Sequence, residues 1–477
     1  MNYRMIRNIL GWLLLFECGF MLIPAITALI YRESEIWCFL LTMLLCGAIG
    51  GVFAFKKPAN RTLYAREGFV IVALSWIVLS LFGALPFRLS GCIPHYVDAL
   101  FETVSGFTTT GASILSEVEP LPRCMLMWRS FTHWVGGMGV LVFVLAFVPL
   151  SGGQNMHIMK AESPGPSVSK LVPRVRTTAL ILYSIYLIMT LALFLFLLFG
   201  RMSVFEALTT AFGTAGTGGF GILNDSMASY SPYIQIVVTV FMLLFSVNFS
   251  CYYLFLLGRF KDGFNSELRR FICIVGAVIL IITLNVRGMF ATLGEALRHV
   301  SFTVASLIST TGFATADFNS WPELSRGLLV VIMFIGACAG STGGGIKVSR
   351  IMILLRGAFN EIGNMARPRR VKRVTLDGHP VEPEVVRAAN VYMVWYVLIF
   401  AVSVLLVSFD DYDLVTNFTA VTATFNNIGP GLNLVGPTGN FAFFSVPSKL
   451  VLIFDMLAGR LELFPMLVLL APSTWKK

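Results

Sequence analysis

Charged residues are scarce in this chain. Of its 477 residues, 13% are Asp, Glu, Lys or Arg, whereas 56% are hydrophobic, and the mean hydropathy is +0.80. A soluble protein of this length would need far more charge to cover its surface, so the soluble globular class is excluded. Apolar runs of about 20 residues, which is enough to cross a bilayer, occur many times. The composition therefore predicts a polytopic membrane protein.

Histidine and cysteine are also scarce, and neither forms a cluster. The five histidines have no metal-ligand spacing, and the eight cysteines include no CxxC pair. We interpret His133, next to Trp134, as a packed side chain, and most cysteines as small core residues. Only Cys92 and Cys124, both near the predicted outer face, leave a disulfide open. The scattered His and Cys residues disfavour a membrane-embedded enzyme, and no catalytic residue is predicted.

The basic residues are unevenly distributed. The formal net charge is +10, and most Lys and Arg residues fall on one side of the predicted topology. This is the positive-inside pattern, which makes that side cytoplasmic and gives no reason to expect a nucleic-acid partner. The longest cytoplasmic segment, about 359–385, is a candidate for docking a regulatory ring or anionic lipid, although orientation alone also explains its charge. The basic positions are Arg4, Arg7, Lys56, Lys57, Arg61 and Arg66, the stretches 160–176, 259–270 and 347–387 (with Arg367, Arg369, Arg370, Lys372 and Arg373), and Lys476 and Lys477.

Long apolar segments recur in a fixed order. Two spans come first, 8–31 and 36–55, and the first lacks a clear signal-peptide cleavage site, so we expect it to remain as a helix. A long helix, a short apolar helix, a glycine turn and a second long helix then recur four times, as in duplicated membrane modules. The expected helices are 67–88, 97–108 and 124–149; 177–200, 204–216 and 232–258; 269–290, 294–309 and 326–358; and 386–408, 412–426 and 447–471. The corresponding division of the chain is 1–60 for the leading spans and 61–150, 151–262, 263–372 and 373–477 for the four units.

Each short helix is followed by a glycine-containing turn. Because the short helices cannot cross a bilayer, the turn backbone must be buried or line water. Glycine permits the backbone angles that align carbonyls, and four such turns around one axis would replace the water around a dehydrated cation, with threonine hydroxyls as further ligands. The predicted cation-binding residues are Thr109, Thr110, Gly111 and Ala112; Thr217, Gly218, Gly219 and Phe220; Thr310, Thr311, Gly312 and Phe313; and Asn427, Ile428, Gly429 and Pro430.

An acidic residue opens each short helix. Asp98, Glu206 and Glu295 each precede an Ala-Leu pair, and Asp413 occupies the related place in the fourth unit. An acid here caps the helix and is favoured by the helix dipole. If the short helices enter from outside, their C-terminal ends point toward the pore and favour a cation. Ordinary capping explains the acids equally well.

A run rich in Gly, Ser and Thr interrupts the second long helix of the third unit near the bilayer midplane. It holds a regular helix poorly, so we interpret it as a flexible barrier below the turns or as a packing kink. Arg460 lies within the last span, where a charge usually faces a cavity or a partner. It would oppose cation passage and bind carbonyls of the run, or else be a structurally paired arginine. Arg129 is better explained by structural pairing, with Glu102 or an exposed carbonyl, than by a direct part in conduction. The predicted gate residues are Gly340, Ser341, Thr342, Gly343, Gly344, Gly345 and Arg460.

Two matches to nucleotide-binding loops are rejected. Residues 216–221 fit GxGxxG, but no strand or βαβ unit surrounds them. The run 340–347 lacks a GK[ST] ending, because Ile346 separates Gly345 from Lys347. No cofactor-binding residue is therefore predicted.

In these turns and the helices after them, the chain resembles the Trk/Ktr/HKT superfamily of potassium transporters, in particular the membrane subunit of bacterial Trk systems. Residues 128–130 (Trp-Arg-Ser) with 134–139 (Trp-Val-Gly-Gly-Met-Gly) are similar to the family's second-helix motif in its first repeat. Residues 339–347 are similar to its mid-membrane gate loop, and Arg460 to an arginine of its last pore-lining helix. The resemblance covers essentially the whole chain.

The resemblance implies a pseudo-fourfold pore in each subunit, usually in a homodimer, and a cytosolic ring of RCK-type nucleotide-binding subunits that controls opening. Glycine in all four turns resembles potassium-selective members, whereas sodium-preferring plant relatives carry serine in the first. The chain departs from the commonest family pattern in the fourth turn, which lacks threonine, and in the second, where Gly218 precedes Gly219.

These observations predict an all-α polytopic membrane protein, with four helix–re-entrant loop–helix repeats in a pseudo-fourfold arrangement after two N-terminal transmembrane helices. The predicted function is potassium uptake across the bacterial cytoplasmic membrane through a selective pore gated by an intramembrane loop, with K⁺ as the transported ion. A potassium symporter coupled to protons or sodium is the alternative, for which Asp455 is the residue to examine. A membrane-embedded enzyme is the more remote one, and a voltage-gated channel is disfavoured because no span has regularly spaced arginines.

Overall fold

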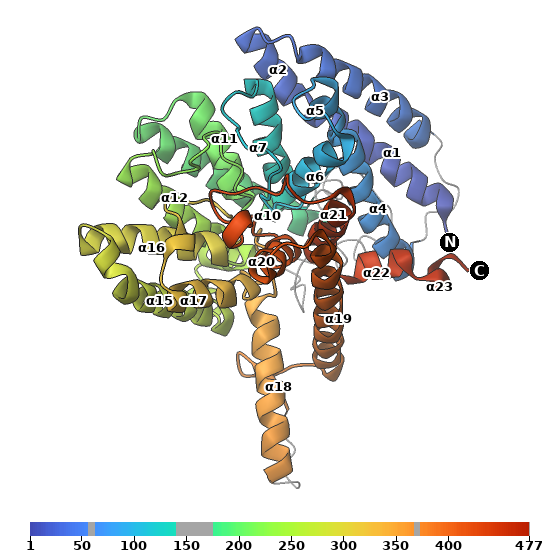
Figure 1. Cartoon of the computed structure of the whole chain (residues 1–477). Helices are drawn as coiled ribbons and strands as arrows, with labels where there is room; N and C mark the ends of the chain where they lie inside the picture. Colours follow the sequence, from blue (N-terminus) through green and yellow to red (C-terminus); the bar gives the residue numbers. More distant parts are fainter. Residues whose placement is uncertain (56–62, 140–174, 367–372, 477) are drawn as a thin grey trace.

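The computed structural model describes residues 1–55, 63–139, 175–366 and 373–476, and the chain in this part is almost entirely helical (Figure 1). Six helical stretches there are long and apolar enough to cross a bilayer, and a bent pair of helices is a seventh candidate. The predicted class, an all-α polytopic membrane protein, is confirmed. The six stretches are Tyr3–Tyr31, Ile36–Phe55, Ala65–Leu89, Thr177–Phe199, Ser266–Met289 and Pro383–Asp410.

The leading spans form a tightly packed pair. Helices α1 (Tyr3–Phe20) and α2 (Leu22–Tyr31) make the first span, and α3 (Ile36–Phe55) the second. A Cβ built on Gly50 would lie 2.9 Å from the carbonyl oxygen of Gly11, so α1 and α3 meet backbone to backbone. Small residues permit such close approach between membrane helices.

The expected order of elements recurs in the four units after this pair. The first helix of each is long, except that a turn divides it in the first unit into α4 and α5. The short helix follows, and then the second helix of the unit. The bounds are α4 (Ala65–Gly83), α5 (Leu85–Leu89), α6 (Tyr96–Phe107) and α7 (Arg123–Gly137); α10 (Val175–Phe199), α11 (Val204–Ala215), α12 (Pro232–Phe245) and α13 (Phe249–Leu256); α15 (Ser266–Val286), α16 (Leu293–Ile308), α17 (Glu323–Phe334) and α18 (Val348–Ala366); and α19 (Pro383–Val407), α20 (Leu414–Phe425), α21 (Val446–Arg460) and α22 (Phe464–Leu470).

Second helices are broken in more units than the sequence analysis expected. The prediction of one helix over 232–258 is wrong, because α12 and α13 are bent by 90° at residues 246–248. The Asn248 side chain accepts the N–H of Ser250 at 2.8 Å and so starts α13 anew. The helix expected over 447–471 is also divided, at residues 461–463, where Glu462 and Leu463 have positive φ. The predicted break in the third unit is confirmed, and it separates α17 from α18.

The first unit's second helix ends earlier than expected within the described residues. Helix α7 stops at Gly137, and Gly139 has a φ of 81°. The remainder of the expected span, 140–149, lies outside the described residues. The predicted boundaries near 60, 150 and 372 also fall in or beside such stretches.

The segment after the third break was misassigned. We expected the second helix to end at 358 and a cytoplasmic loop to follow over about 359–385, and we counted Lys347 with the cytoplasmic charges. Instead, Lys347 is buried and α18 runs on to Ala366. Helices α18 and α19 contact each other and project below the body in Figure 1. Strands β1 (Thr375–Leu376) and β2 (His379–Pro380) form a small antiparallel hairpin between them. The short elements that complete the chain are α14 (Phe260–Gly263), η1 (Arg287–Met289), η2 (Phe318–Ser320), η3 (Ser408–Asp410), η4 (Asn433–Val435) and α23 (Pro472–Trp475).

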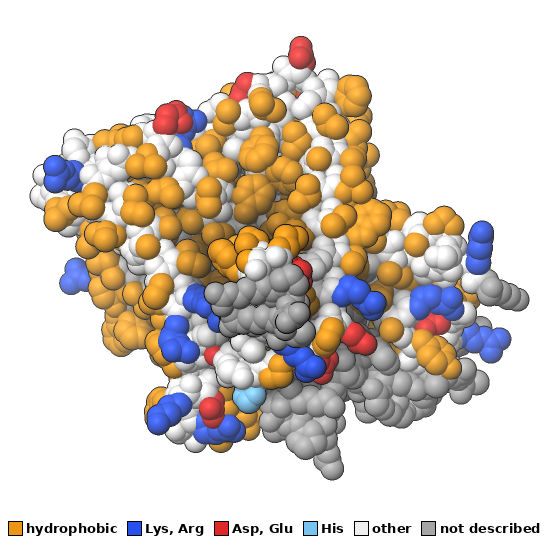
Figure 2. Space-filling model, turned by 90° about the horizontal axis from the view of Figure 1, so that it is seen from below, with side chains coloured by type: hydrophobic (Ala, Val, Ile, Leu, Met, Phe, Trp, Pro, Cys, Tyr) orange, Lys and Arg blue, Asp and Glu red, His pale blue; other side chains and the backbone are white. Residues whose placement is uncertain are grey.

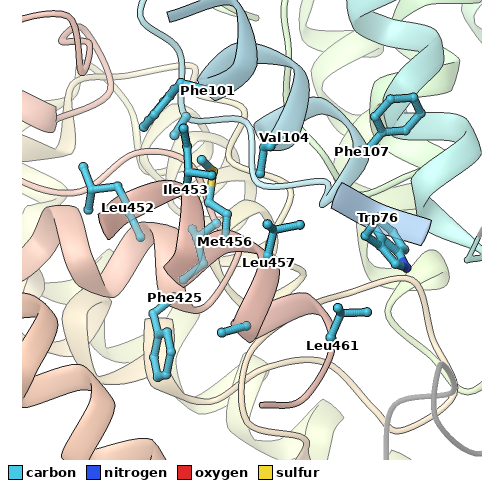
Figure 3. Close-up of a cluster of buried hydrophobic side chains, with 14 of the residues drawn as sticks. Trp76, Phe101, Val104, Phe107, Phe425, Leu452, Ile453, Met456, Leu457 and Leu461 are labelled. Carbon is cyan, nitrogen blue, oxygen red and sulfur yellow. The ribbon is translucent and has the colours of Figure 1, made fainter. Parts of the chain in front are cut away.

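The core joins the fourth unit to the first. Leu452, Ile453, Met456 and Leu457 project from α21 at the three- and four-residue spacing of one helix face. Figure 3 shows them among side chains of three other helices, which include Trp76 of α4, Phe101 of α6 and Phe425 of α20. Helix α21 of the fourth unit is thereby packed against α6 of the first.

Basic side chains gather on one face. Seen from below (Figure 2), Lys and Arg side chains lie over the lower half of the view, next to the residues that are not described, and apolar side chains dominate the rest. Which side of the membrane this face meets stays a prediction from the positive-inside pattern. The basic residues at 56, 57, 61, 160, 170, 174, 367, 369, 370, 372 and 477 lie outside the described residues.

Candidate functional site

Each short helix ends in the same hydrogen-bonded turn. After α6, the N–H of Thr109 donates to the Gly106 carbonyl at 3.1 Å and that of Thr110 to the Ser105 carbonyl at 2.9 Å. These two bonds define a Schellman motif, whose first residue beyond the helix takes a left-handed conformation. We call residues 109–112, 217–220, 310–313 and 427–430 the ring turns. The other three repeat the same pair of bonds, at 3.1 and 2.9 Å, 3.1 and 2.8 Å, and 3.2 and 2.8 Å.

The first residue of every ring turn is left-handed although none is glycine. The φ angles are 55° at Thr109, 53° at Thr217, 60° at Thr310 and 55° at Asn427. Such values are uncommon for side chains other than Asn and Asp, and threonine is β-branched. Because the same left-handed φ occurs at four related positions, the four turns share one backbone shape. Because the motif uses N–H groups internally, the turns present carbonyl oxygens to their surroundings.

The ring glycines show that the four turns meet. A Cβ on Gly111 would overlap the Gly218 carbonyl oxygen of the second turn, and a Cβ on Gly219 would overlap that of Thr311 in the third. The remaining contacts close the circle. A Cβ on Gly312 would overlap the Ile428 carbonyl oxygen, and one on Gly429 would lie 2.8 Å from that of Thr110.

The turns therefore form one ring in chain order, with the second-position carbonyl of each turn against the glycine of its neighbour. We expected glycine at these positions to permit unusual backbone angles, and φ is indeed between 80° and 99° at the four positions. A second requirement for glycine was not expected: the neighbouring turn leaves no room for a side chain. All four glycines also line one pocket on the outer side of the ring, together with loop residues that include Asn224 and Asn440.

The fourth turn keeps the ring shape with asparagine in place of threonine. Asn427 Nδ2 donates to Thr110 Oγ1 at 2.9 Å, in the adjacent ring turn, and to the Met456 carbonyl at 2.8 Å, in α21. Asparagine tolerates left-handed backbone better than threonine does. Asn427, which departs from the family pattern, therefore links the fourth ring turn to the first ring turn and to α21.

The second turn has an extra glycine because a histidine fills the adjacent space. A Cβ on Gly218 would collide with the imidazole ring of His133. Phe220 N–H donates to His133 Nε2 at 3.2 Å, and so Nδ1 carries the proton that bonds the Gly106 carbonyl at 2.8 Å. The interpretation of His133 as a packed side chain is confirmed, with a structural role between α6 and the second ring turn.

A buried ion pair supports the outer side of the first two turns. Arg129 lies 2.8 Å from Glu102, and the two side chains are 3% and 0% exposed. Arg129 also donates to the Gly221 carbonyl at 3.1 Å, and Glu102 accepts the N–H of Ile114 at 3.0 Å. The predicted pairing is confirmed, and it joins residues that follow the first and second ring turns.

The acids of the short helices have ordinary structural partners. Glu206 accepts the N–H of Ser203, Glu295 that of Ala291, and Asp413 that of Thr416. Asp98 differs, since it pairs with Lys449 at 2.6 Å and links α6 to α21. Capping is therefore confirmed for three acids, and the electrostatic role toward a cation stays a prediction.

The loop between α17 and α18 lies directly beneath the third and fourth turns. Gly344 N–H donates to Thr310 Oγ1 at 2.7 Å, and a Cβ on Gly344 would lie 2.5 Å from the Asn426 carbonyl oxygen. The loop is also bonded to the break in the second unit, where Phe249 N–H donates to the Gly340 carbonyl at 3.0 Å. We call residues 335–347 the gate loop. It contains all the predicted gate residues except Arg460.

Arg460 holds the gate loop to the first unit. Its guanidinium donates to the Thr342 carbonyl at 2.6 Å and to the carbonyls of Gly136 and Gly137 at 2.6 and 2.8 Å. The predicted contact with carbonyls of the run is thus present. The bonds to α7 were not predicted, and they place the cation at the negative end of that helix dipole.

Lys347 is the site residue that sequence reasoning missed. Its ammonium group donates to the Gly343 carbonyl and to the Gly344 carbonyl at 3.2 Å, and the residue is 2% exposed. The signal was a lysine two residues after the glycine-rich run, which we weighed only as a phosphate-loop ending and as a cytoplasmic charge. Two cations, Arg460 and Lys347, therefore bind carbonyls of the gate loop just below the ring.

Cys92 and Cys124 are both free thiols in the structure, so the disulfide left open above is not formed there. Among the described residues, no group of three or more His, Cys, Asp and Glu side chains is placed to hold a metal ion.

The fold and the ring define a polytopic membrane protein built around a fourfold ring of re-entrant turns with a loop beneath it. The TrkH cation transport protein family matches residues 37–477. The chain is 36% identical over 486 aligned residues to the Trk system potassium uptake protein TrkH of Escherichia coli K12, covering 100% of both chains. It is 31% identical to TrkG of the same organism, covering 100% of this chain and 99% of TrkG.

A solved structure extends the likeness to three dimensions. The crystal structure of the potassium transporter TrkH from Vibrio parahaemolyticus superposes with a TM-score of 0.90 at 34% identity, over 100% of both chains. The chain therefore belongs to the TrkH family of cation transport proteins. It is a multi-pass transporter of the bacterial inner membrane and not an enzyme.

Proposed function

We propose that this chain takes up potassium through the axis of the four ring turns and that the gate loop closes this path from the inside. The observation that carries the proposal is the closed ring, in which equivalent carbonyls of four turns face one another's glycines. Such an arrangement replaces the hydration shell of a cation by backbone oxygens. The potassium assignment is supported by the names of the relatives, which are potassium uptake proteins.

No energy-supplying chemistry is needed for uptake through such a path. A negative interior favours entry of a monovalent cation by about 2.3 kcal/mol per 100 mV. The ligands of the ion in this proposal are the ring-turn residues named above, with the carbonyls of Thr110, Gly218, Thr311 and Ile428 nearest to the neighbouring glycines.

The gate role of the 335–347 loop is supported by its position under the ring and by its contacts. It touches the third and fourth turns, and two cationic side chains, Lys347 and Arg460, bind its carbonyls. A positive charge close to the axis opposes a cation there. Deleting Gly343 to Gly345 is expected to raise flux, and unchanged flux would remove the barrier role.

The proposal is tested by cation flux into liposomes that contain the purified full-length chain, with empty liposomes as the control. We expect K⁺ uptake under a negative interior potential, and growth of a potassium-uptake-deficient cell at low external potassium. No uptake by a correctly folded, detergent-stable protein would contradict the pore. Selectivity is measured as K⁺ flux in competition with Na⁺.

Ion-coupled symport is the second candidate, and one buried acid favours examining it. Asp455 is fully buried in α21, where Oδ1 accepts a bond from Ser403 at 2.7 Å. Its Oδ2 has no hydrogen-bond partner among the residues that the structure describes. A channel gives a reversal potential set by the K⁺ gradient alone, whereas a symporter shifts when a proton or sodium gradient is imposed.

We further propose a homodimer and a cytosolic RCK-type nucleotide-binding subunit as partners. The support is the family resemblance together with the words "Trk system" in the names of the relatives. Light scattering of the purified chain tests the dimer. Co-purification with the candidate subunit, with and without nucleotide, tests the second partner.

A further inference from the structure

One carboxylate oxygen binds residues on both sides of the glycine-rich run 340–345 of the gate loop. Glu267 lies in the first turn of α15, and its Oε1 accepts the N–H of Ala339 at 2.9 Å and the N–H of Ser349 at 3.0 Å. Ala339 immediately precedes the glycine-rich run, and Ser349 is the second residue of α18. The two flanks of the loop are therefore joined through a single atom of a different helix.

The surroundings of Glu267 favour a strong interaction. The residue is only 9% exposed, and it lies at the N-terminus of its own helix and against the N-terminal turn of α18. Both helix ends favour negative charge. Hydrogen bonds from backbone N–H groups to a carboxylate are shorter and stronger than those between neutral groups. The contact therefore fixes where α18 begins relative to the loop.

The cytoplasmic hairpin holds the turn that carries Glu267. Asp377 Oδ1 accepts the N–H of Ser266 at 2.7 Å, next to Glu267 in the chain. Asp377 and Gly378 both have positive φ, 49° and 82°, as a two-residue hairpin turn requires. Arg356 of α18 donates to the Thr375 carbonyl, which fixes the other side of the hairpin.

A cavity separates the hairpin from the loop flanks. Its volume is about 420 Å³, and its lining includes Asn265, Glu267, Ala339, Ser349 and Asp377. The hairpin and the gate loop are thus joined across this space by the first turn of α15. A displacement of the hairpin on the cytoplasmic side is transmitted to Glu267 through Ser266.

We propose that Glu267 is a positioning residue that keeps the gate loop closed under the ring by holding both of its flanks, and that Asp377 fixes the turn from which it acts. This inference rests on the proposed role of the loop as a barrier. It is distinct from the roles of Arg460 and Lys347, because Glu267 binds backbone N–H groups on either side of the glycine-rich run and the two cations bind carbonyls within it.

The test compares the full-length chain with Glu267→Ala, Glu267→Gln and Asp377→Ala. Two quantities are measured for each: hydrogen–deuterium exchange of a peptide covering 336–350, and K⁺ leak from liposomes. We expect the amides of Ala339 and Ser349 to exchange on the order of tenfold faster in Glu267→Ala, as loss of a bond to a charged group predicts. Leak is expected to rise with it, and Glu267→Gln and Asp377→Ala are expected to show smaller increases in both.

Glu295→Ala is the matched control, because Glu295 also lies in the first turn of a helix but accepts only from its own segment. It is expected to change neither measurement. Unchanged exchange over 336–350 in Glu267→Ala overturns the positioning role, whatever the leak. Faster exchange without added leak shows that the loop is not a barrier, which overturns the gate function itself. If Glu267→Ala does not fold, Asp377→Ala is the test, because Asp377 is exposed. Wild-type exchange and wild-type leak in Asp377→Ala would then overturn the inference.

Discussion

Arg460 Nη1 lies 2.6 Å from the carbonyl oxygen of Thr342, and this bond crosses from α21 in the fourth unit to the middle of the gate loop. The same guanidinium bonds the last carbonyls of α7. One side chain therefore ties three of the four units together beneath the ring. Its planar set of donors suits this task, and a lysine would not reproduce it.

Arg460→Ala is expected to raise K⁺ leak by on the order of tenfold, because it removes a charged hydrogen bond to the loop and a cation near the path. Leak is measured in liposomes as above. Arg460→Lys keeps the charge but not the bidentate geometry, and should give an intermediate leak. A fall in flux without any leak would contradict the role of Arg460 in closure.

Gly111→Ser is expected to weaken the preference for K⁺ over Na⁺. A Cβ there overlaps the Gly218 carbonyl oxygen, and φ is 80°, so the first and second turns must move apart. Gly91→Ser is the matched control: φ is 77°, but no atom lies within 4 Å of the added Cβ. It carries the backbone strain without the clash. If Gly111→Ser retains full discrimination in a K⁺/Na⁺ competition assay, Gly111 is not a selectivity position.

Asn427→Thr is expected to lower stability by about 1–3 kcal/mol, because the bonds to Thr110 and Met456 are lost and buried acceptors are left unpaired. Threonine already occupies the equivalent left-handed position in the other turns, so the backbone itself tolerates it. Thermal denaturation in detergent measures the loss.

The control for that substitution is Asn440→Thr. Asn440 also bonds a hydroxyl in another unit, that of Ser116 at 3.3 Å, but this bond is exposed to solvent. We expect a change within about 0.5 kcal/mol there. Equal effects at the two positions would show that the Asn427 bridge adds nothing.

Glu102→Gln and Arg129→Gln are each expected to destabilise the protein by about 3–5 kcal/mol, since each leaves a buried charge without its partner. The double variant should be more stable than the sum of the single losses predicts. Unfolding measured for all four proteins gives the coupling energy. Strict additivity would show that the 2.8 Å contact is energetically silent.

The sequence predicted what periodicity and composition determine, such as the membrane class, the repeated order of helices and the positions of the four ring turns. It also predicted Glu102 as a partner for Arg129, since a buried charge needs one. The breaks at 246–248 and 461–463 were missed because apolar periodicity continues across them, and only a capping residue such as Asn248 marks the first.

Contacts between segments that are far apart in the chain could not be predicted from the sequence. That Gly218 packs on His133, or that Lys347 turns back onto the gate loop, depends on which segments the fold brings together. Glycine was assigned to its backbone angle alone for the same reason. The neighbour that excludes a side chain lies 92 to 116 residues away for the first three turns and 319 residues away for the fourth.

The ring closes between the last and the first turn, and this seam has a consequence for biosynthesis. Its bonds, from Asn427 to Thr110 and from Lys449 to Asp98, need residues that leave the ribosome last. Until they arrive, three quarters of the circle stand in the bilayer with an open side. The ring of the nascent protein therefore cannot close before translation is nearly finished. The last step of folding joins the fourth unit to the first.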